Sequence, residues 1–579
     1  MDPNNPEWVI HPKGDSLRKI IPFMKETFQI ESIAQSPSLP KNKVMSKLPR
    51  PTICAGFMES LKATLKPNQV STDNENRLCH TFGKNYRDLW RVRNGLIERP
   101  PDAVVFPSCH QDVEVIMQAA VQHNVCLIPF GGGTNVVGAV EPDPSETKRM
   151  IVTMDMRRMG RLLAVDQESK TAVFEAGVLG PALEEQLEKH GLTLGHDPDS
   201  FMHSTLGGWI ATRSSGANSN KYGDLEDMVL ALKVVTPKGT VCTPTVPRAV
   251  GPDVNEVFLG SEGVLGVITE ATMKTHARPP CRITEGWLFP TFATACAASQ
   301  DMVTSECLPT VLRCYDDHET QLSFAMKSAE GPLKQLLSDS IKHYLTQCKH
   351  FDLTKVSLVI LGFEGFAGAV AMQRAQVKKV CKRHNGFSVG KSAGANWQRK
   401  KYDQPLVRDF LLDNGCWADV LETAVNYSSA IALWRDVKAS MQRYWTEKDL
   451  KGWVGCHTSH QYQYGCCMYF TFGGVQQGPH DINTFLGLKQ AATEAILRNG
   501  GSLSHHHGVG YEHVPWMQRY QGKGGLQMLQ GLKKVLDPKG VCNPGKLLPP
   551  EGEEDGEQGD PKRQESMMFY RMGTLKSKL

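Results

Sequence analysis

Three consecutive histidines are the first candidates for chemistry in this sequence. His505, His506 and His507 lie between glycines in the segment GSLSHHHGVG, residues 501–510. On an extended chain neighbouring side chains alternate, which predicts His505 and His507 on one side and His506 on the other. Three such rings do not converge easily on one metal ion, and no carboxylate or cysteine at helical spacing completes a site. We therefore expect no metal here but the wall of an active centre, where imidazoles donate hydrogen bonds or move protons near neutral pH.

A βαβ unit is predicted well before the histidines. Residues 102–107 favour a strand, residues 108–124 an amphipathic helix and residues 125–130 a second strand. Ser108 is the expected N-cap of this helix and Asn124 its expected end. The unit matters because a glycine-rich segment follows its second strand.

That segment begins with Gly131, Gly132 and Gly133. Consecutive glycines let backbone N–H groups turn toward an anion, because no Cβ blocks positive φ values or a close approach. Neither G-x-G-x-x-G nor G-K-[ST] is present, so the Rossmann and Walker patterns do not apply. On its own the loop indicates either a phosphate cradle or an ordinary turn.

Composition excludes several classes of protein. The chain has 579 residues, 40% of them hydrophobic and 22% charged, so two or more domains are expected. A net charge of +4, from 65 basic and 61 acidic residues, argues against a nucleic-acid-binding protein. The sequence has no apolar run of about 18 residues, so no transmembrane helix is expected. The 16 cysteines are scattered without a CxxC pair, which predicts mostly free thiols in a reducing compartment.

The changes of composition along the chain predict five parts. Residues 1–78 form a helical segment and linker, 79–280 a first domain, and 281–499 a second domain inserted into it. Residues 500–550, which carry the histidines, return to the first domain. The acidic, polar residues 551–579 are expected to form a flexible tail.

The last three residues resemble an address for import into peroxisomes. Ser577, Lys578 and Leu579 spell S-K-L, which an import receptor recognises at a carboxyl terminus. The alternative is a basic end without meaning. We expect a peroxisomal protein, or a glycosomal one if the source is a kinetoplastid.

Five segments together carry a resemblance to a known family. They are RPPDAVVFPSCHQDV (99–113), IPFGGGTNVVG (128–138), the run from HDPDSF to LEDMV (196–229), GSEGVLGVITEAT (260–272) and NGGSLSHHHGVG (499–510). They resemble the alkylglycerone-phosphate synthases (alkyl-dihydroxyacetonephosphate synthases), within the vanillyl-alcohol oxidase type of FAD-binding proteins. The likeness runs from about residue 80 to residue 548 and is strongest in the glycine-rich segments and the triple histidine.

The resemblance implies an α+β fold and a non-redox reaction. The fold has a two-subdomain FAD-binding domain with an inserted α+β cap domain for substrate. Such enzymes exchange the acyl group of 1-acyl-dihydroxyacetone phosphate for a long-chain fatty alcohol, giving 1-alkyl-dihydroxyacetone phosphate and a fatty acid. The flavin acts there as a nucleophile, while the protein supplies position and proton transfer.

The resemblance also implies which residues bind FAD, which is expected to be held without a covalent bond. Carried over onto this sequence they are Pro129, Phe130, Gly131, Gly132, Gly133, Thr134, Asn135, Asp199, Ser200, Phe201, Met202, His203, Ser204, Thr205, Thr212, Arg213, Ser214, Ser215, Glu262, Gly263, Val264, Leu265, Gly266, Val267 and Ile268.

Three further residues gain roles from the resemblance. Tyr469 corresponds to the family's catalytic tyrosine, which moves a proton at C1 of the substrate if its pKa is lowered; an aromatic packed in a strand is the alternative. Arg408 corresponds to the substrate-binding arginine, suited to a phosphate, and is otherwise a surface residue. Arg313 either orders the flavin site or pairs with Asp316 or Asp317. With these residues the three histidines complete the expected active site.

A flavin-dependent dehydrogenase of 2-hydroxy acids such as lactate or glycolate is the alternative function, because fold alone does not fix activity. The lipid substrates imply peripheral contact with the inner face of the peroxisomal membrane. A homodimer is implied only by the resemblance.

Overall fold

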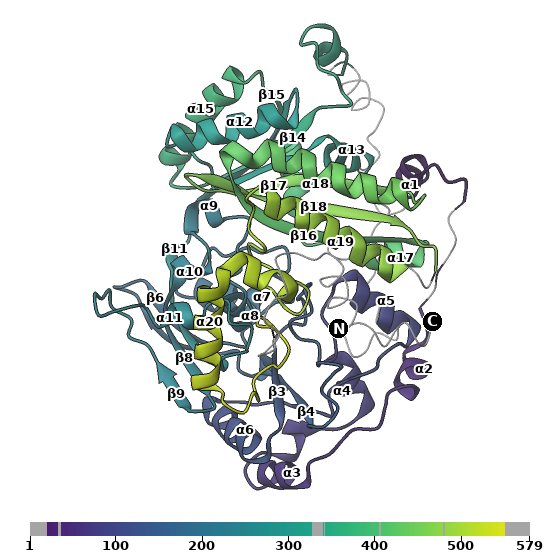
Figure 1. Ribbon diagram of the computed structural model, residues 1–579. Coiled ribbons are helices and arrows are strands. Elements are labelled where there is room, and N and C mark those ends of the chain that lie inside the picture. Colours follow the sequence, from purple (N-terminus) through teal and green to yellow (C-terminus); the bar gives the residue numbers. More distant parts are fainter. Residues whose placement is uncertain are drawn as a thin grey trace.

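The computed structural model describes residues 20–32, 36, 38–326, 340, 342–403, 407–478 and 481–549. In Figure 1 a large sheet with long helices forms the upper half, and two smaller sheets form most of the lower half. The start of the predicted N-terminal segment and the S-K-L tail lie outside the described residues. No helix of the described part is long and apolar enough to cross a membrane.

A four-stranded sheet carries the predicted βαβ unit. Its order is β1 (Val70–Ser71), β2 (Ala103–Val105), β4 (Ile151–Asp155), β3 (Cys126–Phe130). β2 and β3 both run parallel to β4, which lies between them. The isolated bridge between Leu127 and Cys542 brings the segment around Cys542 to the outer edge of β3.

The helix of this unit, α6 (His110–His123), ends as predicted at Asn124, whose φ is +54°. Its N-cap is Cys109 and not Ser108. The prediction of Ser108 was wrong because its hydroxyl and its backbone N–H both donate to Asp112, at 2.8 Å each.

A five-stranded antiparallel sheet follows, together with a two-stranded one. The larger sheet has the order β5 (Leu162–Asp166), β6 (Thr171–Glu175), β10 (Val267–Lys274), β8 (Val229–Thr236), β9 (Gly239–Cys242). The smaller sheet pairs β7 (Leu192–Thr193) with β11 (His276–Ala277). α7 (Gly180–Glu188) and α8 (Leu206–Ala211) pack in the same core, and α20 (Met517–Leu536) of the C-terminal part lies beside them (Figure 1).

A seven-stranded antiparallel sheet dominates the upper half. Its order is β15 (Phe387–Gly390), β12 (Cys281–Phe289), β14 (Ser357–Gly365), β13 (Val311–Tyr315), β17 (Gly452–Gln461), β18 (Gly465–Val475), β16 (Cys416–Asn426). One face packs on α12 (Phe292–Thr304), α15 (Ala367–Arg383), α18 (Tyr427–Glu447) and α19 (Asp481–Arg498). The helices α13 (Asp317–Ala325) and α16 (Lys391–Lys400) also pack against this sheet.

Alternation along β18 decides which of its residues belong to the core. Met468, Phe470 and Phe472 are fully buried against the long helices. Tyr469, between them, therefore points to the opposite face, toward the lower half of the molecule.

The remaining helices lie mostly near the N-terminus or in connections. They are α1 (Ile20–Phe28), α2 (Lys41–Ser46), α3 (Ala55–Lys62), α4 (Asn74–Cys79), α5 (Tyr86–Asn94), α9 (Ser219–Tyr222), α10 (Leu225–Met228), α11 (Asn255–Phe258) and α17 (Val407–Asp413). Short 3₁₀ turns are η1 (Pro67–Gln69), η2 (Met156–Arg158) and η4 (Val514–Trp516). All 16 cysteines are free thiols, as predicted.

Candidate active site

One large cavity lies between the seven-stranded sheet and the smaller sheets. Its volume is 1310 Å³, larger than the roughly 300–1,000 Å³ that holds one small-molecule ligand. Its walls include the predicted glycine loop, the segment around Ser200, strand residues such as Tyr469, and apolar side chains of α1 and α17. The cavity therefore has room for a cofactor together with a second, partly apolar molecule.

The glycine loop fits the role of a cofactor cradle. A Cβ at Gly132 would overlap the carbonyl oxygen of His203, and one at Gly131 would overlap the hydroxyl of Thr205. Gly133 has a φ of +66°, which favours glycine. The loop thus crosses the second predicted segment so closely that only glycine fits, and both segments line the same cavity.

Most of the residues predicted to bind FAD line this cavity, but four do not. Phe201 stacks on Trp209 with ring centroids 6.3 Å apart. Arg213 forms an ion pair with Glu256. Val264 and Leu265 are buried in a hydrophobic core. These four residues support the pocket from behind and do not form its surface.

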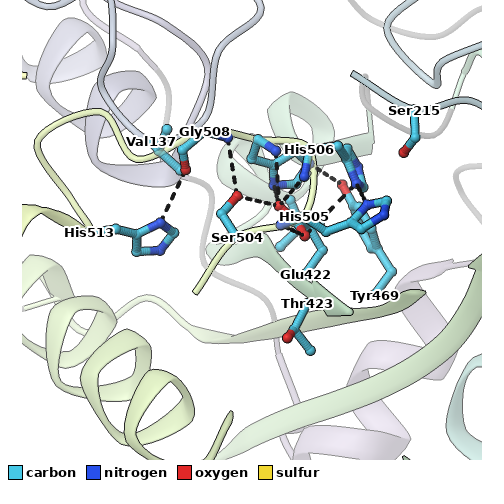
Figure 2. A network of polar contacts seen from close by, with 12 residues as sticks. Val137, Ser215, Glu422, Thr423, Tyr469, Ser504, His505, His506, Gly508 and His513 are labelled. Carbon is cyan, nitrogen blue, oxygen red and sulfur yellow. Dashed lines mark hydrogen bonds and ion pairs between the residues drawn. The ribbon is translucent and has the colours of Figure 1, made fainter. Parts of the chain in front are cut away.

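The triple histidine is held by a buried carboxylate that the sequence analysis missed. Figure 2 shows Glu422, from β16, enclosed by the histidine loop (Ser504–His507). The carboxylate accepts the backbone N–H of His505 at 2.7 Å, of His506 at 3.1 Å and of His507 at 2.9 Å, and the hydroxyl of Ser504 at 2.8 Å. The predicted alternation was wrong, because successive N–H groups that turn toward one anion curl the backbone.

Glu422 remains ionised in this setting. Burial opposes its charge, but His506, His507 and His505 and the backbone donors hold its pKa well below the usual range. A buried carboxylate with that many donors is stabilised as the anion. It fixes the position of the loop and of the rings that the loop carries.

Tyr469 lies directly beside this arrangement. In the register of the sheet it is the cross-strand partner of Glu422 on β16 and of His457 on β17. Its hydroxyl oxygen is 3.3 Å from Nε2 of His507, and its ring stacks on His457 at 5.0 Å. Burial raises the pKa of Tyr469 well above its usual value, so the lowered pKa considered from the sequence is not found. Here the tyrosine is a neutral hydrogen-bond donor.

Arg313 belongs to a second buried network of hydrogen bonds. Its guanidinium donates to Asp199 at 3.3 and 3.4 Å and to Nε2 of His457 at 2.7 Å. Nδ1 of His457 is 2.7 Å from Glu319. Burial and the neighbouring Arg313 lower the pKa of His457, so its imidazole is neutral and donates to Glu319. Arg313 therefore contacts Asp199, one of the residues predicted to bind FAD.

The other alternative for Arg313 is not taken. Asp316 and Asp317 both pair with Lys438, at 2.7 and 3.3 Å.

Arg408, on α17, lines the cavity with a side chain only 15% exposed, and its NH1 is 3.9 Å from the buried carboxylate of Asp419. It is therefore a residue of the cavity wall and not a surface arginine.

A β-bulge explains why His457 and His460 could not be recognised together. Residues three apart on a regular strand face opposite sides. Between Thr458 and His460 the pairing with β18 shifts by one residue, so His460 pairs with Cys467 while His457 pairs with Tyr469. Both histidines consequently face the site. The only signals in the sequence were an acid and two histidines among the polar residues of two mainly buried strands.

With this geometry in view, the comparisons with known proteins place the chain. A sequence profile of the FAD binding domain matches residues 101–244, and one of the C-terminal domain of FAD linked oxidases matches residues 278–547. The chain is 48% identical over 570 residues to the alkyldihydroxyacetonephosphate synthase of Trypanosoma brucei brucei, covering 97% of this chain and 93% of that protein. The chain belongs to the alkyldihydroxyacetonephosphate synthase family.

Other members agree with this assignment. The synthase of Dictyostelium discoideum is 46% identical, over 87% of this chain and 82% of its own. A solved structure of an alkyldihydroxyacetonephosphate synthase superposes with a TM-score of 0.80 at 41% identity, over 92% of this chain and 93% of that one. The predicted α+β fold and FAD are confirmed.

The alternative function finds only distant support. The mitochondrial D-lactate dehydrogenase (cytochrome) of Arabidopsis thaliana is 27% identical over 85% of this chain. Likeness to a solved structure of the 4-ethylphenol oxidase from Gulosibacter chungangensis, with a TM-score of 0.63 at 15% identity, shows the fold alone.

Proposed function

We propose that this protein exchanges the acyl group of 1-acyl-dihydroxyacetone phosphate for a long-chain fatty alcohol. The products are 1-alkyl-dihydroxyacetone phosphate and a fatty acid. The observation that carries the proposal is the single cavity in which the glycine loop, Tyr469 with His507, Arg408 and an apolar wall meet. A flavin, a phosphate and a hydrocarbon chain each find matching chemistry there.

Arg408 is the proposed partner of the substrate phosphate. A guanidinium binds a phosphate through two parallel hydrogen bonds, and this side chain lines the cavity next to a second polar group, Asp419. The carboxylate of Asp419 directs the guanidinium before substrate arrives. Arg313 acts one layer further out, because its contacts are with Asp199 and His457.

Tyr469 and His507 are the proposed proton carriers at C1 of the substrate. The hydroxyl of Tyr469 is protonated and lies within reach of the neutral Nε2 of His507. Neutral His507 accepts the proton that leaves carbon, either directly or through the hydroxyl of Tyr469, which gives its own proton to Nε2 as it takes the new one. The imidazolium that forms lies beside Glu422, whose carboxylate is 3.7 Å from Nδ1 of His507. Glu422 keeps the two groups at this separation.

FAD is held by the glycine loop and by the segments that cross it. Asp199, Ser200 and Thr205 line the cavity beside Gly131 to Gly133, and Glu262 also lines it. Bound FAD supplies the nucleophilic chemistry that the exchange requires. The protein contributes position, proton transfer and the exclusion of water.

The apolar end of the cavity suits the hydrocarbon chains. Met24 and Phe28 of α1 pack there with Leu411 of α17 and with Trp453. Burying each methylene group contributes about 0.8 kcal/mol, so a long chain gains much of its affinity from this wall.

The decisive assay uses purified protein with FAD, palmitoyl-dihydroxyacetone phosphate and radiolabelled hexadecanol without an electron acceptor. We expect labelled ether and free palmitate in equal amounts, and loss of both in Tyr469→Phe with FAD still bound. Dye reduction by lactate or glycolate without ether formation would instead establish the dehydrogenase alternative. Acid denaturation that releases all flavin would agree with non-covalent FAD.

Location, membrane contact and oligomeric state form the rest of the proposal. S-K-L at residues 577–579 supports import into peroxisomes, and the lipid substrates support peripheral contact with the inner face of the membrane. A fluorescent protein carrying residues 551–579 should enter peroxisomes, and removal of Leu579 should leave it outside. Flotation with vesicles and light scattering test the membrane contact and the homodimer.

A further inference from the structure

Four side chains able to bind a transition metal meet at one side of the histidine loop. They are His460 on β17, its cross-strand partner Cys467 on β18, and His505 and His506. One ligand atom from each lies within 4.8 Å of those of the other three. The Nδ1 atoms of His505 and His506 are 3.0 Å apart. The bulge in β17 and the curled loop, neither visible in the sequence, create this cluster.

One ring nitrogen of His460 is buried without a hydrogen-bond partner among the described residues. Its side chain is 4% exposed, and its Nδ1 forms no hydrogen bond with any residue of the described chain. Its Nε2 is engaged, 2.7 Å from Oγ of Ser215 and 3.2 Å from Oγ of Ser459. A buried ring nitrogen without a partner costs free energy, and a metal ion would satisfy it.

The surrounding hydrogen bonds are those of a metal site. The hydroxyl of Tyr462 donates to Asp224 at 2.6 Å, so its oxygen accepts the Nε2 proton of His505. The lone pair of His505 is thereby left on Nδ1, the atom that faces His506. Metal-binding histidines characteristically donate their second nitrogen to an oxygen in this way, and Nε2 of His460 likewise has an oxygen within reach, Oγ of Ser215 at 2.7 Å.

We propose that His460, Cys467, His505 and His506 form a binding site for a zinc ion. Three imidazoles and a thiolate are a ligand set that Zn²⁺ takes in tetrahedral geometry. Bond lengths of about 2.0–2.3 Å place such ligand atoms roughly 3.3–3.8 Å apart. The side chains therefore close by about 1 Å. The proton shared between the Nδ1 atoms of His505 and His506 moves to Nε2 of His506, so that both Nδ1 lone pairs face the ion, and the thiol proton of Cys467 leaves to solvent when the sulfur binds.

Zinc at this site inhibits the enzyme, an effect that rests on the proposed function. The ring of His506 lies 5.9 Å from that of Tyr469 and 4.5 Å from that of His507. A zinc ion bound to His506 places positive charge beside Tyr469 and His507, and it therefore disfavours the charge that His507 gains when it accepts the proton. Removal of zinc by a chelator restores activity.

The first test measures binding without activity. Holoenzyme is stripped of metal and titrated with Co²⁺, whose visible bands report tetrahedral coordination beyond the flavin absorption, and Zn²⁺ competition gives the affinity. We expect one ion per chain, and a loss of affinity of more than about tenfold in Cys467→Ser and in Cys467→Ala. Cys466→Ser is the matched control, because the neighbouring Cys466 is buried in the core on the other face of β18.

The outcomes separate the two proposals. No binding, or equal binding by all variants with unchanged flavin content and melting temperature, overturns the zinc site. In the ether assay, zinc should inhibit wild type and Cys466→Ser but not Cys467→Ser, which keeps its activity in zinc-free buffer. Equal inhibition of wild type, Cys466→Ser and Cys467→Ser by zinc would overturn the claim that zinc inhibits through this site. If no form makes ether, the proposed function fails while the Co²⁺ titration still decides the site.

Discussion

At the scale of single residues, Glu422 organises the reacting groups. It is a buried acid that touches no predicted substrate atom but receives four hydrogen bonds from the histidine loop and faces Tyr469 across the sheet. Glu422 affects the reaction rate through the positions of the groups that it holds. A displacement of a reacting group by about 1 Å lowers the rate by on the order of 100-fold.

Replacing this anion should therefore separate catalysis from folding. We expect Glu422→Gln to lower kcat by on the order of 100-fold, with FAD content and the KM for acyl substrate nearly unchanged. Glu285→Gln is the matched control, since Glu285 is another buried acid of the same sheet, paired with Arg374. Equal losses in the two variants would contradict a role specific to the histidine loop.

The pH dependence should show that His505 and His507 are uncharged in the free enzyme, before the proton transfer begins. Burial lowers the pKa of His505 and of His507 from the ordinary 6.5, and it raises the pKa of Tyr469 from 10. Groups that act neutral are fully active above a lowered pKa and below a raised one. Hence kcat/KM should stay level from about pH 6.5 to about pH 8.5. A tenfold fall in kcat/KM for each unit of rising pH in this range would mean that a protonated histidine is required.

The residue scale also shows how far the sequence alone reaches. Tyr469 and the three histidines were found because whole segments around them resemble a family. Glu422 and His457 were missed because polar residues at these positions of a strand match no motif. Their roles arise from register, which pairs Glu422 with Tyr469 at a separation of 47 positions along the chain that no local pattern encodes.

At the scale of elements, α1 closes the apolar end of the cavity. Ile20, Met24 and Phe28 form a stripe at helical spacing and pack on Cys416 of β16. The helix contacts the wall that we assign to the hydrocarbon chain, so its side chains should set chain length.

A larger residue on this stripe should shorten the usable channel. We expect Met24→Trp to reduce activity with hexadecanol by roughly tenfold more than activity with octanol, because overpacking costs about 1–3 kcal/mol. Glu26→Trp, on the exposed side of the same helix, should leave the ratio of the two activities unchanged. An equal loss of activity with both alcohols in Met24→Trp would mean that the hydrocarbon chain binds in another part of the cavity.

Elements themselves were more predictable than their partners. The stripe of apolar residues gave the extent of α6 to within about two residues, since local periodicity suffices for a helix. The strands β2 and β3 were also expected, but β4 lies between them. That insertion depends on a strand 20 residues downstream of β3, which local pattern does not pair.

At the scale of the whole molecule, the C-terminal part locks the cofactor half. Asn543 is 1% exposed, and its side-chain amide donates to Ala139 at 2.8 Å and to Glu262 at 2.7 Å. The same residue's backbone N–H reaches Leu127 on β3. Asn543 thus joins the sheet that carries the glycine loop to the segment around Glu262, which also lines the cavity.

Loss of this junction should loosen FAD and not the upper sheet. Asn543→Ala removes two buried hydrogen bonds worth about 1 kcal/mol each, so the melting temperature of the holoenzyme should fall by about 2–4 °C with flavin released first. Asn499→Ala, which removes comparable bonds to Asp436 and Ala495 in the upper half, should keep its flavin through the same range. Simultaneous release in both variants would contradict a local lock.

The extra residue in β17 has a consequence for how this family diverges. Ser459 lets His457 and His460 share a face, and three strands hold Glu422, Tyr469 and Cys467 in register with them. Any insertion or deletion within these strands would rotate half of the polar groups into the hydrophobic core. We therefore expect homologous proteins to differ in amino acids along β16, β17 and β18 while the lengths of these three strands stay constant. Insertions and deletions should be confined to the connecting loops.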